Sequence, residues 1–436
     1  METLSFNLQA TGNKFKILNA TNGGPWHKRH HPVPNYPLTN LAAYKAARIP
    51  YSRNHDSGVC GTYGGPYSHD ISNIFPNFDA DPYNPESYDF ACTDESIMIC
   101  LEAGTETFFR LGQTIEHQIK KHHTLPPKDF KKWAVICEHI IRHYNEGWAD
   151  GYQLNMQYWE IWNEPDLVSN TSPTWGGTPE QFYDFYETAA KHLKSCFPHL
   201  KIGGPALSHV PAWADKFLCE MQKRNVPIDF FSFHGYAYEP AKMIAKAERV
   251  KEVLIKNNYA SAERILNEWN YVRDWYDNMI YSRLSIIGIK GASFTLACMC
   301  ASQQSDAIDM LMYYDTRPST WNGVFDFYTL KPLKGYYPFY WYGMFYDMQK
   351  EIPAENSIDD VYSLCGVDKN GKALAVLTYF IDDDTAGDKT VKLNFGRPGN
   401  YEIYLLDNEH TNELVATTDD LTFTLKNYTC IMIKEV

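Results

Sequence analysis

The sequence predicts an α/β fold, a (β/α)₈ TIM barrel followed by a C-terminal antiparallel β-sandwich. Over residues 15–346, short apolar runs alternate with amphipathic stretches, whereas residues 347–436 contain only short alternating segments separated by turns. The length of 436 residues also exceeds one ordinary domain and fits a large barrel with a smaller partner. We therefore expect a barrel over 15–346 and a sandwich over 347–436, with residues 1–14 supplying an N-terminal strand that joins the sandwich.

The predicted barrel strands are apolar segments that are rich in β-branched and aromatic residues, with turn residues after them. Between them lie stretches with apolar residues at helical spacing, which predict the covering helices. Regular alternation of the two is typical of a TIM barrel. The expected strands are 15–19, 46–55, 107–112, 158–162, 200–204, 230–235, 264–269 and 310–315, and the clearest helices are 126–144, 179–197, 212–224 and 240–257.

The last 90 residues or so read as strands alone. Turns such as Lys369-Asn-Gly371 separate the segments, which predicts antiparallel neighbours. Residues 4–10 show the same alternation and are expected to return to this domain. The expected strands are 361–367, 373–380, 390–395, 401–406, 421–425 and 429–434.

Composition excludes several classes of function. The formal net charge is -13 and no dense block of Lys and Arg occurs, which argues against nucleic acid or an anionic membrane as the partner. No apolar run approaches the length of a membrane span, and the first residues lack the features of a signal peptide. We therefore expect either a cytoplasmic protein or an exported one whose leader was removed.

Cofactor and metal motifs are also missing from the sequence. The ten cysteines are scattered without a C-x-x-C pair, so we expect mostly free thiols and neither a zinc site nor a disulfide framework. No glycine-rich nucleotide-binding motif is present, and we expect no cofactor and no metal. Aromatic residues make up 15% of the chain, a mild indication of the flat rings that line carbohydrate clefts.

The most informative segment is Tyr158-Trp-Glu-Ile-Trp-Asn-Glu-Pro-Asp-Leu167. Its apolar residues indicate a buried strand, and Pro165 ends that strand because proline has no N–H to donate. Asn163 and Glu164 then lie at the carboxyl end, where TIM-barrel active sites are found. Glu268 ends the predicted seventh strand, and such a pair of carboxyl groups can supply the proton donor and the nucleophile or base for glycoside hydrolysis.

Four segments give the chain a resemblance to the family 39 glycoside hydrolases, members of a large clan of barrels with catalytic glutamates at the ends of strands four and seven. Trp159-Glu-Ile-Trp-Asn-Glu-Pro-Asp166 resembles the acid/base motif, and Leu266-Asn-Glu-Trp-Asn270 resembles the nucleophile motif. Tyr51-Ser-Arg-Asn-His-Asp56 resembles the clan's second-strand arginine followed by the family's histidine, and Phe233-His-Gly-Tyr236 resembles its sixth-strand motif.

The resemblance implies a retaining double displacement in which Glu164 is the acid/base and Glu268 the nucleophile. Arg53 and Tyr236 would keep Glu268 ionised, and Asn163 would hydrogen-bond the 2-hydroxyl of the sugar. Arg53 could instead be a purely structural ion-pair partner, and we expect Glu160 to be a buried ion-pair partner rather than a third catalyst. The residues expected to line the sugar subsite are His55, His234, Trp321, Asp315 and His27.

The resemblance further implies an exo-acting, β-xylosidase-like enzyme that acts on glycosides or oligosaccharides from plant or host polysaccharides. Glucosides, galactosides, arabinosides and uronides stay open as substrates, and Arg273 or Arg317 could pair with the carboxylate of a uronide. A different class of function is a non-catalytic carbohydrate-binding barrel. The sequence leaves the oligomeric state open.

Overall fold

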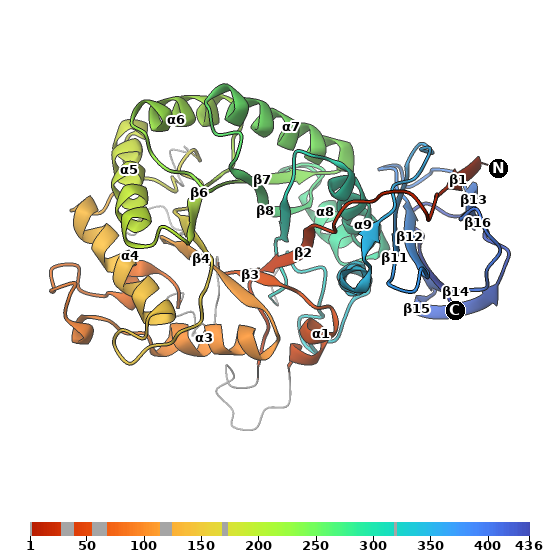
Figure 1. Cartoon of the computed structure of the whole chain (residues 1–436), viewed down its shortest axis with the longest axis horizontal. Helices are drawn as coiled ribbons and strands as arrows, with labels where there is room; N and C mark the ends of the chain where they lie inside the picture. Colours follow the sequence, from red (N-terminus) through yellow and green to blue (C-terminus); the bar gives the residue numbers. More distant parts are fainter. Residues whose placement is uncertain (1, 28–38, 55–67, 114–123, 168–172, 318–320) are drawn as a thin grey trace.

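The computed structural model describes residues 2–27, 39–54, 68–113, 124–167, 173–317 and 321–436. Eight parallel strands close into a barrel in sequence order, and two further sheets form a separate C-terminal unit beside it (Figure 1). The predicted fold class is therefore confirmed. The barrel strands are β2 (Ile17–Asn22), β3 (Tyr51–Arg53), β4 (Glu106–Leu111), β5 (Tyr158–Ile161), β6 (Lys201–Leu207), β7 (Phe230–Ala237), β8 (Glu263–Tyr271) and β9 (Met310–Tyr313).

Helices cover the outside of the barrel, and several begin where the sequence supplies a cap. Asp129 accepts hydrogen bonds from the backbone N–H groups of Lys131 and Lys132, which starts α4. Thr178 and Gln181 form a capping box at the start of α5. The α-helices are α1 (Leu41–Ala46), α2 (Ile71–Ile74), α3 (Ala91–Glu102), α4 (Phe130–Asn145), α5 (Pro179–Cys196), α6 (Ala212–Lys223), α7 (Pro240–Lys256), α8 (Met279–Ile286), α9 (Ile289–Gln304) and α10 (Tyr337–Met344), with 3₁₀ turns η3 (Pro85–Ser87), η4 (Lys334–Tyr336) and η5 (Phe345–Asp347).

The predicted second strand was wrong over its first half. Ala46 is the last residue of α1 (Leu41–Ala46), residues 47–50 form the turn and link after this helix, and the strand β3 begins only at Tyr51. The segment Leu-Ala-Ala-Tyr-Lys-Ala is rich in strong helix formers, so local propensity favours the helix there. His55, at the end of the predicted strand, lies outside the described residues.

The C-terminal unit is built from two sheets that pack around their own core. One sheet has the order β10-β11-β12-β17-β14-β15, and the other has the order β1-β13-β16. The N-terminal strand β1 pairs in parallel with β13, with Leu4 opposite Leu393. The strands are β1 (Glu2–Ser5), β10 (Lys350–Glu351), β11 (Val361–Val367), β12 (Ala373–Tyr379), β13 (Lys389–Asn394), β14 (Tyr401–Leu406), β15 (Thr411–Thr418), β16 (Thr422–Leu425) and β17 (Cys430–Glu435).

Helix α9 packs between the barrel and one face of the sandwich, in a hydrophobic core that contains residues of both. Nearly all of its residues are buried, and Phe294 contacts Trp269 on the barrel side and Phe380 on the sandwich side. Because this contact is large and apolar, the two domains are held in a fixed relation. No single helix in the described part of the chain has the length and hydropathy of a membrane span, and α8 with α9 meets that test only as a pair bent by 78°.

Candidate active site

The turn after β5 presents Glu164 at the carboxyl end of the barrel. Trp162 and Glu164 adopt positive φ angles of 71° and 47°, a region that residues other than glycine rarely occupy. The backbone N–H of Glu164 donates to the carbonyl of Ala206 at 3.0 Å, and the indole of Trp162 donates to the carbonyl of Thr174 at 2.9 Å. These contacts stabilise a turn of the strained kind that is common at functional sites.

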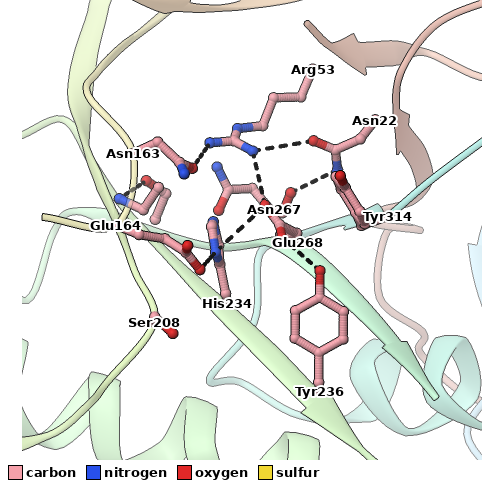
Figure 2. A network of polar contacts seen from close by, with 12 residues as sticks. Asn22, Arg53, Asn163, Glu164, Ser208, His234, Tyr236, Asn267, Glu268 and Tyr314 are labelled. Carbon is pink, nitrogen blue, oxygen red and sulfur yellow. Dashed lines mark hydrogen bonds and ion pairs between the residues drawn. The ribbon is translucent and has the colours of Figure 1, made fainter. Parts of the chain in front are cut away.

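Glu268 lies within β8 rather than at its end, because the strand continues to Tyr271. The register of β7 and β8 places His234 opposite Glu268, and Tyr236 follows His234 by two residues on the same face. The hydroxyl of Tyr236 donates to Oε1 of Glu268 at 2.6 Å. Two neighbouring strands therefore direct these three side chains to one point, as Figure 2 shows.

The imidazole of His234 lies between the two glutamates. Its Nδ1 is 2.7 Å from Oε1 of Glu164 and 3.5 Å from Oε2 of Glu268 (Figure 2). One ligating atom from each of the three side chains lies within 4.8 Å of the others, and all three residues are buried. The carboxyl groups predicted from separate sequence motifs are thus brought together across the barrel.

Arg53 forms the base of the site. Its Nη2 donates to Oδ1 of Asn163 at 2.6 Å, and its Nη1 lies 3.4 Å from Oε2 of Glu268. Its Nε pairs with Oε2 of Glu160 at 2.7 Å, and both of these side chains are fully buried. The expectation that Glu160 is a buried ion-pair partner is confirmed, and Arg53 both forms that pair and reaches the site.

The network beneath Arg53 contains residues that the sequence analysis missed. The amide of Asn267 and the hydroxyl of Ser232 each donate to Oε1 of Glu160 at 2.5 Å. Oδ1 of Asn22, the last residue of β2, accepts from Nη1 of Arg53 at 3.2 Å. Asn22 and Ser232 belong to no recognisable motif, whereas Asn267 stands directly before Glu268 in the segment Leu266-Asn-Glu-Trp-Asn270.

Burial raises the pKa of both carboxyl groups, but their other neighbours differ. Burial and the nearby carboxylate of Asp166 raise the pKa of Glu164 to about 7. Burial also raises the pKa of Glu268, but His234, Arg53 and the Tyr236 hydroxyl favour its ionised form and oppose the rise. Burial lowers the pKa of His234 to about 4, so its imidazole is neutral at pH 7. A protonated Glu164 beside an ionised Glu268 is the combination that acid-assisted nucleophilic chemistry requires.

Asp166 and Lys246 complete the surroundings of Glu164. Asp166 is buried and accepts hydrogen bonds from the backbone N–H groups of Ser208, at 3.0 Å, and His209. Nζ of Lys246 donates to the carbonyl of Ser208 at 2.8 Å, and burial lowers the pKa of Lys246. Asp166 stands in the same sequence motif as Glu164, whereas nothing in the sequence of α7 marked Lys246.

The remaining predicted residues lie at the same end of the barrel, since they follow β2 and β9. The Trp321 ring is 6.2 Å from that of Tyr236, centroid to centroid, a position from which it can wall the sugar subsite. Asp315 is buried and accepts from Nε of Arg317 at 2.9 Å. His27 is partly buried beyond β2, and its contact with sugar, like that of Asp315, stays a prediction.

Arg273, the first residue that the sequence offers as a partner for a uronide, is already paired within the protein. Its guanidinium faces the sandwich, where Nη2 lies 2.8 Å from Oδ2 of Asp382. Arg317 is likewise engaged, by Asp315. Because each arginine is already paired with a carboxylate of the protein, neither has an unpaired charge to offer to the carboxylate of a uronide.

Two clusters among the described residues have the spacing of metal ligands. One is Glu164, His234 and Glu268, and the other is Glu138, His192 and Cys196 on α4 and α5. A guanidinium lies beside each cluster, since Arg53 is 3.4 Å from Glu268 and Arg142 is 2.8 Å from Glu138. These positive charges oppose the binding of a divalent cation.

Comparison with known proteins identifies the family. The model of "Glycosyl hydrolases family 39" matches residues 69–284, which include Asn163, Glu164, His234, Tyr236 and Glu268. A β-xylosidase of Caldicellulosiruptor saccharolyticus is 29% identical over 228 residues, covering 46% of this chain and 45% of that protein. A β-xylosidase of Geobacillus stearothermophilus is 33% identical over 117 residues, covering 27% of this chain and 22% of that protein.

These alignments span less than half the length of either relative. The fold of the whole chain is shared with a solved glucosidase from Croceicoccus marinus, with a TM-score of 0.78 at 20% identity, covering 100% of this chain and 99% of that one. Family match, relatives and architecture agree with the motifs around the two glutamates. Residues 69–284 of the chain belong to glycosyl hydrolase family 39.

Proposed function

We propose that this protein is a retaining, exo-acting O-glycoside hydrolase of β-xylosidase-like specificity, which works by double displacement. The observation that carries the proposal is the short separation of the two carboxyl groups, whose nearest ligating oxygens lie within 4.8 Å. Retaining enzymes hold their carboxyl groups about 5–5.5 Å apart, whereas inverting enzymes leave room for a water at about 6.5–9.5 Å. The observed spacing supports retention.

In the first step, the carboxyl of Glu164 gives its proton to the glycosidic oxygen as the bond from that oxygen to the anomeric carbon breaks. The carboxylate of Glu268 attacks the anomeric carbon from the opposite face and forms a glycosyl ester. In the second step, the carboxylate of Glu164 takes a proton from water, whose oxygen attacks the anomeric carbon. The ester bond to Glu268 then breaks and both glutamates return to their starting states.

The surrounding residues support these roles. The hydroxyl of Tyr236 and the guanidinium of Arg53 favour the ionised nucleophile. Arg53 occupies Oδ1 of Asn163, while the buried Nδ2 of Asn163 has no hydrogen-bond partner among the residues that the structure describes. A buried amide donor without a partner is costly, and the sugar 2-hydroxyl is a suitable acceptor for it.

The choice of sugar rests on the relatives. The two curated relatives described above are named β-xylosidases, whereas one solved structure of similar fold is named a glucosidase. The engagement of Arg273 by Asp382 takes away one argument for a uronide. We therefore place β-xylosides first and β-glucosides second, with galactosides and arabinosides after them.

Hydrolysis of a panel of aryl glycosides, followed by proton NMR, tests this proposal. The panel contains the β-xyloside, β-glucoside, β-galactoside, α-L-arabinosides and α-L-iduronide, and we expect the β-anomer of xylose to be released first from the β-xyloside. Release of the α-anomer would contradict retention. Absence of turnover on every glycoside, with sugar binding detected by calorimetry, would instead favour a non-catalytic carbohydrate-binding barrel.

A further inference from the structure

A loop of the sandwich places a carboxylate at the rim of the barrel. Asp382 is only 6% exposed at its side chain. Its Oδ1 accepts from the hydroxyl of Tyr271 at 2.7 Å and pairs with Nζ of Lys290 at 2.6 Å, while its Oδ2 accepts from Nε of Arg273 at 2.9 Å. These donors come from the end of β8, from α9 and from the loop after β8. Asp382 therefore joins the strand of the nucleophile to the segment that follows it.

The sandwich core fixes this carboxylate. The side chain of Asn427 accepts from the backbone N–H of Ile381 at 3.2 Å and donates to its carbonyl at 2.9 Å. The preceding residue, Phe380, is buried against Phe294 of α9. Asp382 thus sits on a rigid support that belongs to the second domain.

The loop after β8 leads back to the nucleophile. Arg273 is held further by its backbone N–H, which donates to Oγ of Ser282 at 3.0 Å, and by the ring of Tyr281, 4.3 Å from the guanidinium. Two residues later, the ring of Trp275 contacts that of Tyr236, with 4.9 Å between the centroids at 73°. Tyr236 in turn donates to Glu268 at 2.6 Å.

Trp275 depends on its loop for its position. Its side chain sits at the rim, and the residue is 47% exposed, so solvent covers much of the ring. The described contacts of that ring are with Tyr236 and Trp321, 5.4 Å away, both at the mouth of the barrel. A shift of the loop would therefore move one of the rings that limits the position of Tyr236.

We propose that Asp382 is a positioning residue for the nucleophile, acting through Arg273 and Trp275 on the Tyr236–Glu268 hydrogen bond. The proposal rests on the proposed function, because it assigns Asp382 to the support of Glu268 as nucleophile. It makes the sandwich a structural part of the active site. Asp382 itself does not contact the reacting atoms.

Asp384 offers a matched control on the same loop. Its carboxylate also has three donors, Lys290, Tyr281 and Tyr428. Lys290 also pairs with Asp382, and the Tyr281 ring contacts Arg273, but none of the three donors lies on β8 or in the loop up to Trp275. Asp382→Asn and Asp384→Asn each remove one charge from the same interface. If Asp382 only stabilised the contact between the two domains, the two variants would lose activity to the same extent.

We expect Asp382→Asn to lower kcat about tenfold, with a smaller change in KM, since misplaced catalytic groups reduce rate more than affinity. The acidic limb of its pH profile should move to higher pH, because the Tyr236 hydrogen bond that favours ionised Glu268 is weakened. Asp384→Asn should leave kcat and the acidic limb unchanged. Equal effects of the two variants, or none from Asp382→Asn, would overturn the proposal.

Two further measurements identify the route of the effect. If Asp382 acts through Trp275, the losses of kcat in Asp382→Asn and Trp275→Ala should not add in the double variant; additive losses would contradict that route. Crystal structures of the two Asn variants need no turnover, and we expect a longer Tyr236–Glu268 hydrogen bond only in Asp382→Asn. An inactive wild type would contradict the proposed function, whereas an unchanged hydrogen bond in Asp382→Asn would contradict this inference.

Discussion

Arg53 and Glu160 form an ion pair of 2.7 Å in which both side chains are completely buried beneath the candidate catalytic carboxyl groups. The pair costs desolvation energy, and Ser232 and Asn267 offset part of that cost by donating to Glu160. Its geometric consequence is that the remaining nitrogens of Arg53 point at Asn163 and Glu268. The guanidinium at the base of the site thereby orients Asn163 on one side and Glu268 on the other.

Arg53→Lys should separate the two roles of this arginine. An ammonium group can still pair with Glu160 but cannot keep the fork of contacts to Asn163 and Glu268. We expect kcat/KM to fall about 10²-fold, while the free energy of unfolding falls by about 1–3 kcal/mol. Kinetics and urea unfolding measure the two quantities. Arg48→Lys, at an exposed pair with Asp347, is the control, and a collapsed fold in Arg53→Lys alone would favour a purely structural role.

Glu268→Gln should abolish turnover and leave the fold and sugar affinity largely intact. The amide has nearly the same shape but cannot form the glycosyl ester, so we expect a loss of at least about 10³-fold in kcat. Steady-state kinetics and calorimetry with the product sugar measure the two properties. Glu263→Gln, at the other end of β8, is the matched control, and retained activity in Glu268→Gln would remove Glu268 as nucleophile.

The loss of activity in Glu164→Ala should depend strongly on the leaving group of the substrate. Oligosaccharides need a proton on the departing oxygen, whereas activated nitrophenyl glycosides do not, so we expect a loss of about 10²–10⁴-fold in the glycosylation rate for the former only. Pre-steady-state kinetics on both substrate classes separate glycosylation from the later water attack. Equal losses in glycosylation would count against the acid role.

The pH profile of the wild type should fall on its alkaline side near pH 7. Glu164 must be protonated in the free enzyme, and its pKa is raised to about 7 by burial and Asp166. We therefore expect kcat/KM for an oligosaccharide to drop about tenfold per pH unit above that value. Asp166→Asn should move the limb to lower pH, because it removes a negative charge that disfavours ionisation. An unchanged limb would show that another group controls it.

The stability of the fold should also depend on pH through Glu164. The pKa of Glu164 is raised in the folded state, so the protein binds this proton more tightly than the unfolded chain does. Its contribution is fully present below about pH 4.5 and is lost as the pH rises through 7, a change of about 3 kcal/mol. Glu164→Gln removes this dependence. We expect the free energy of unfolding of the variant, measured in urea and relative to that of wild type, to be higher at pH 8 than at pH 5. An equal difference between variant and wild type at both pH values would contradict the raised pKa.

Local sequence predicted the barrel strands and the amphipathic helices where one face is buried. The segment 158–162 became β5 (Tyr158–Ile161), a short apolar run that is buried throughout, and 179–197 became α5 (Pro179–Cys196), whose apolar residues recur at helical spacing on the buried face. Strand β15 was missed because nearly all of its residues are exposed, so it lacks an alternating pattern. Helix α9 was missed for the opposite reason, since it is buried on every side.

By itself, the sequence determined the architecture and predicted the two candidate catalytic glutamates, because strand periodicity, Pro165 and the motifs around Glu164 and Glu268 are local signals. Tertiary structure alone decided which charges meet. Arg273 is bound by Asp382, 109 residues further along the chain, and Arg53 is bound by Glu160, 107 residues away. The strength of such pairs depends on distance and burial in the folded protein, and neither quantity is encoded in any short stretch of residues.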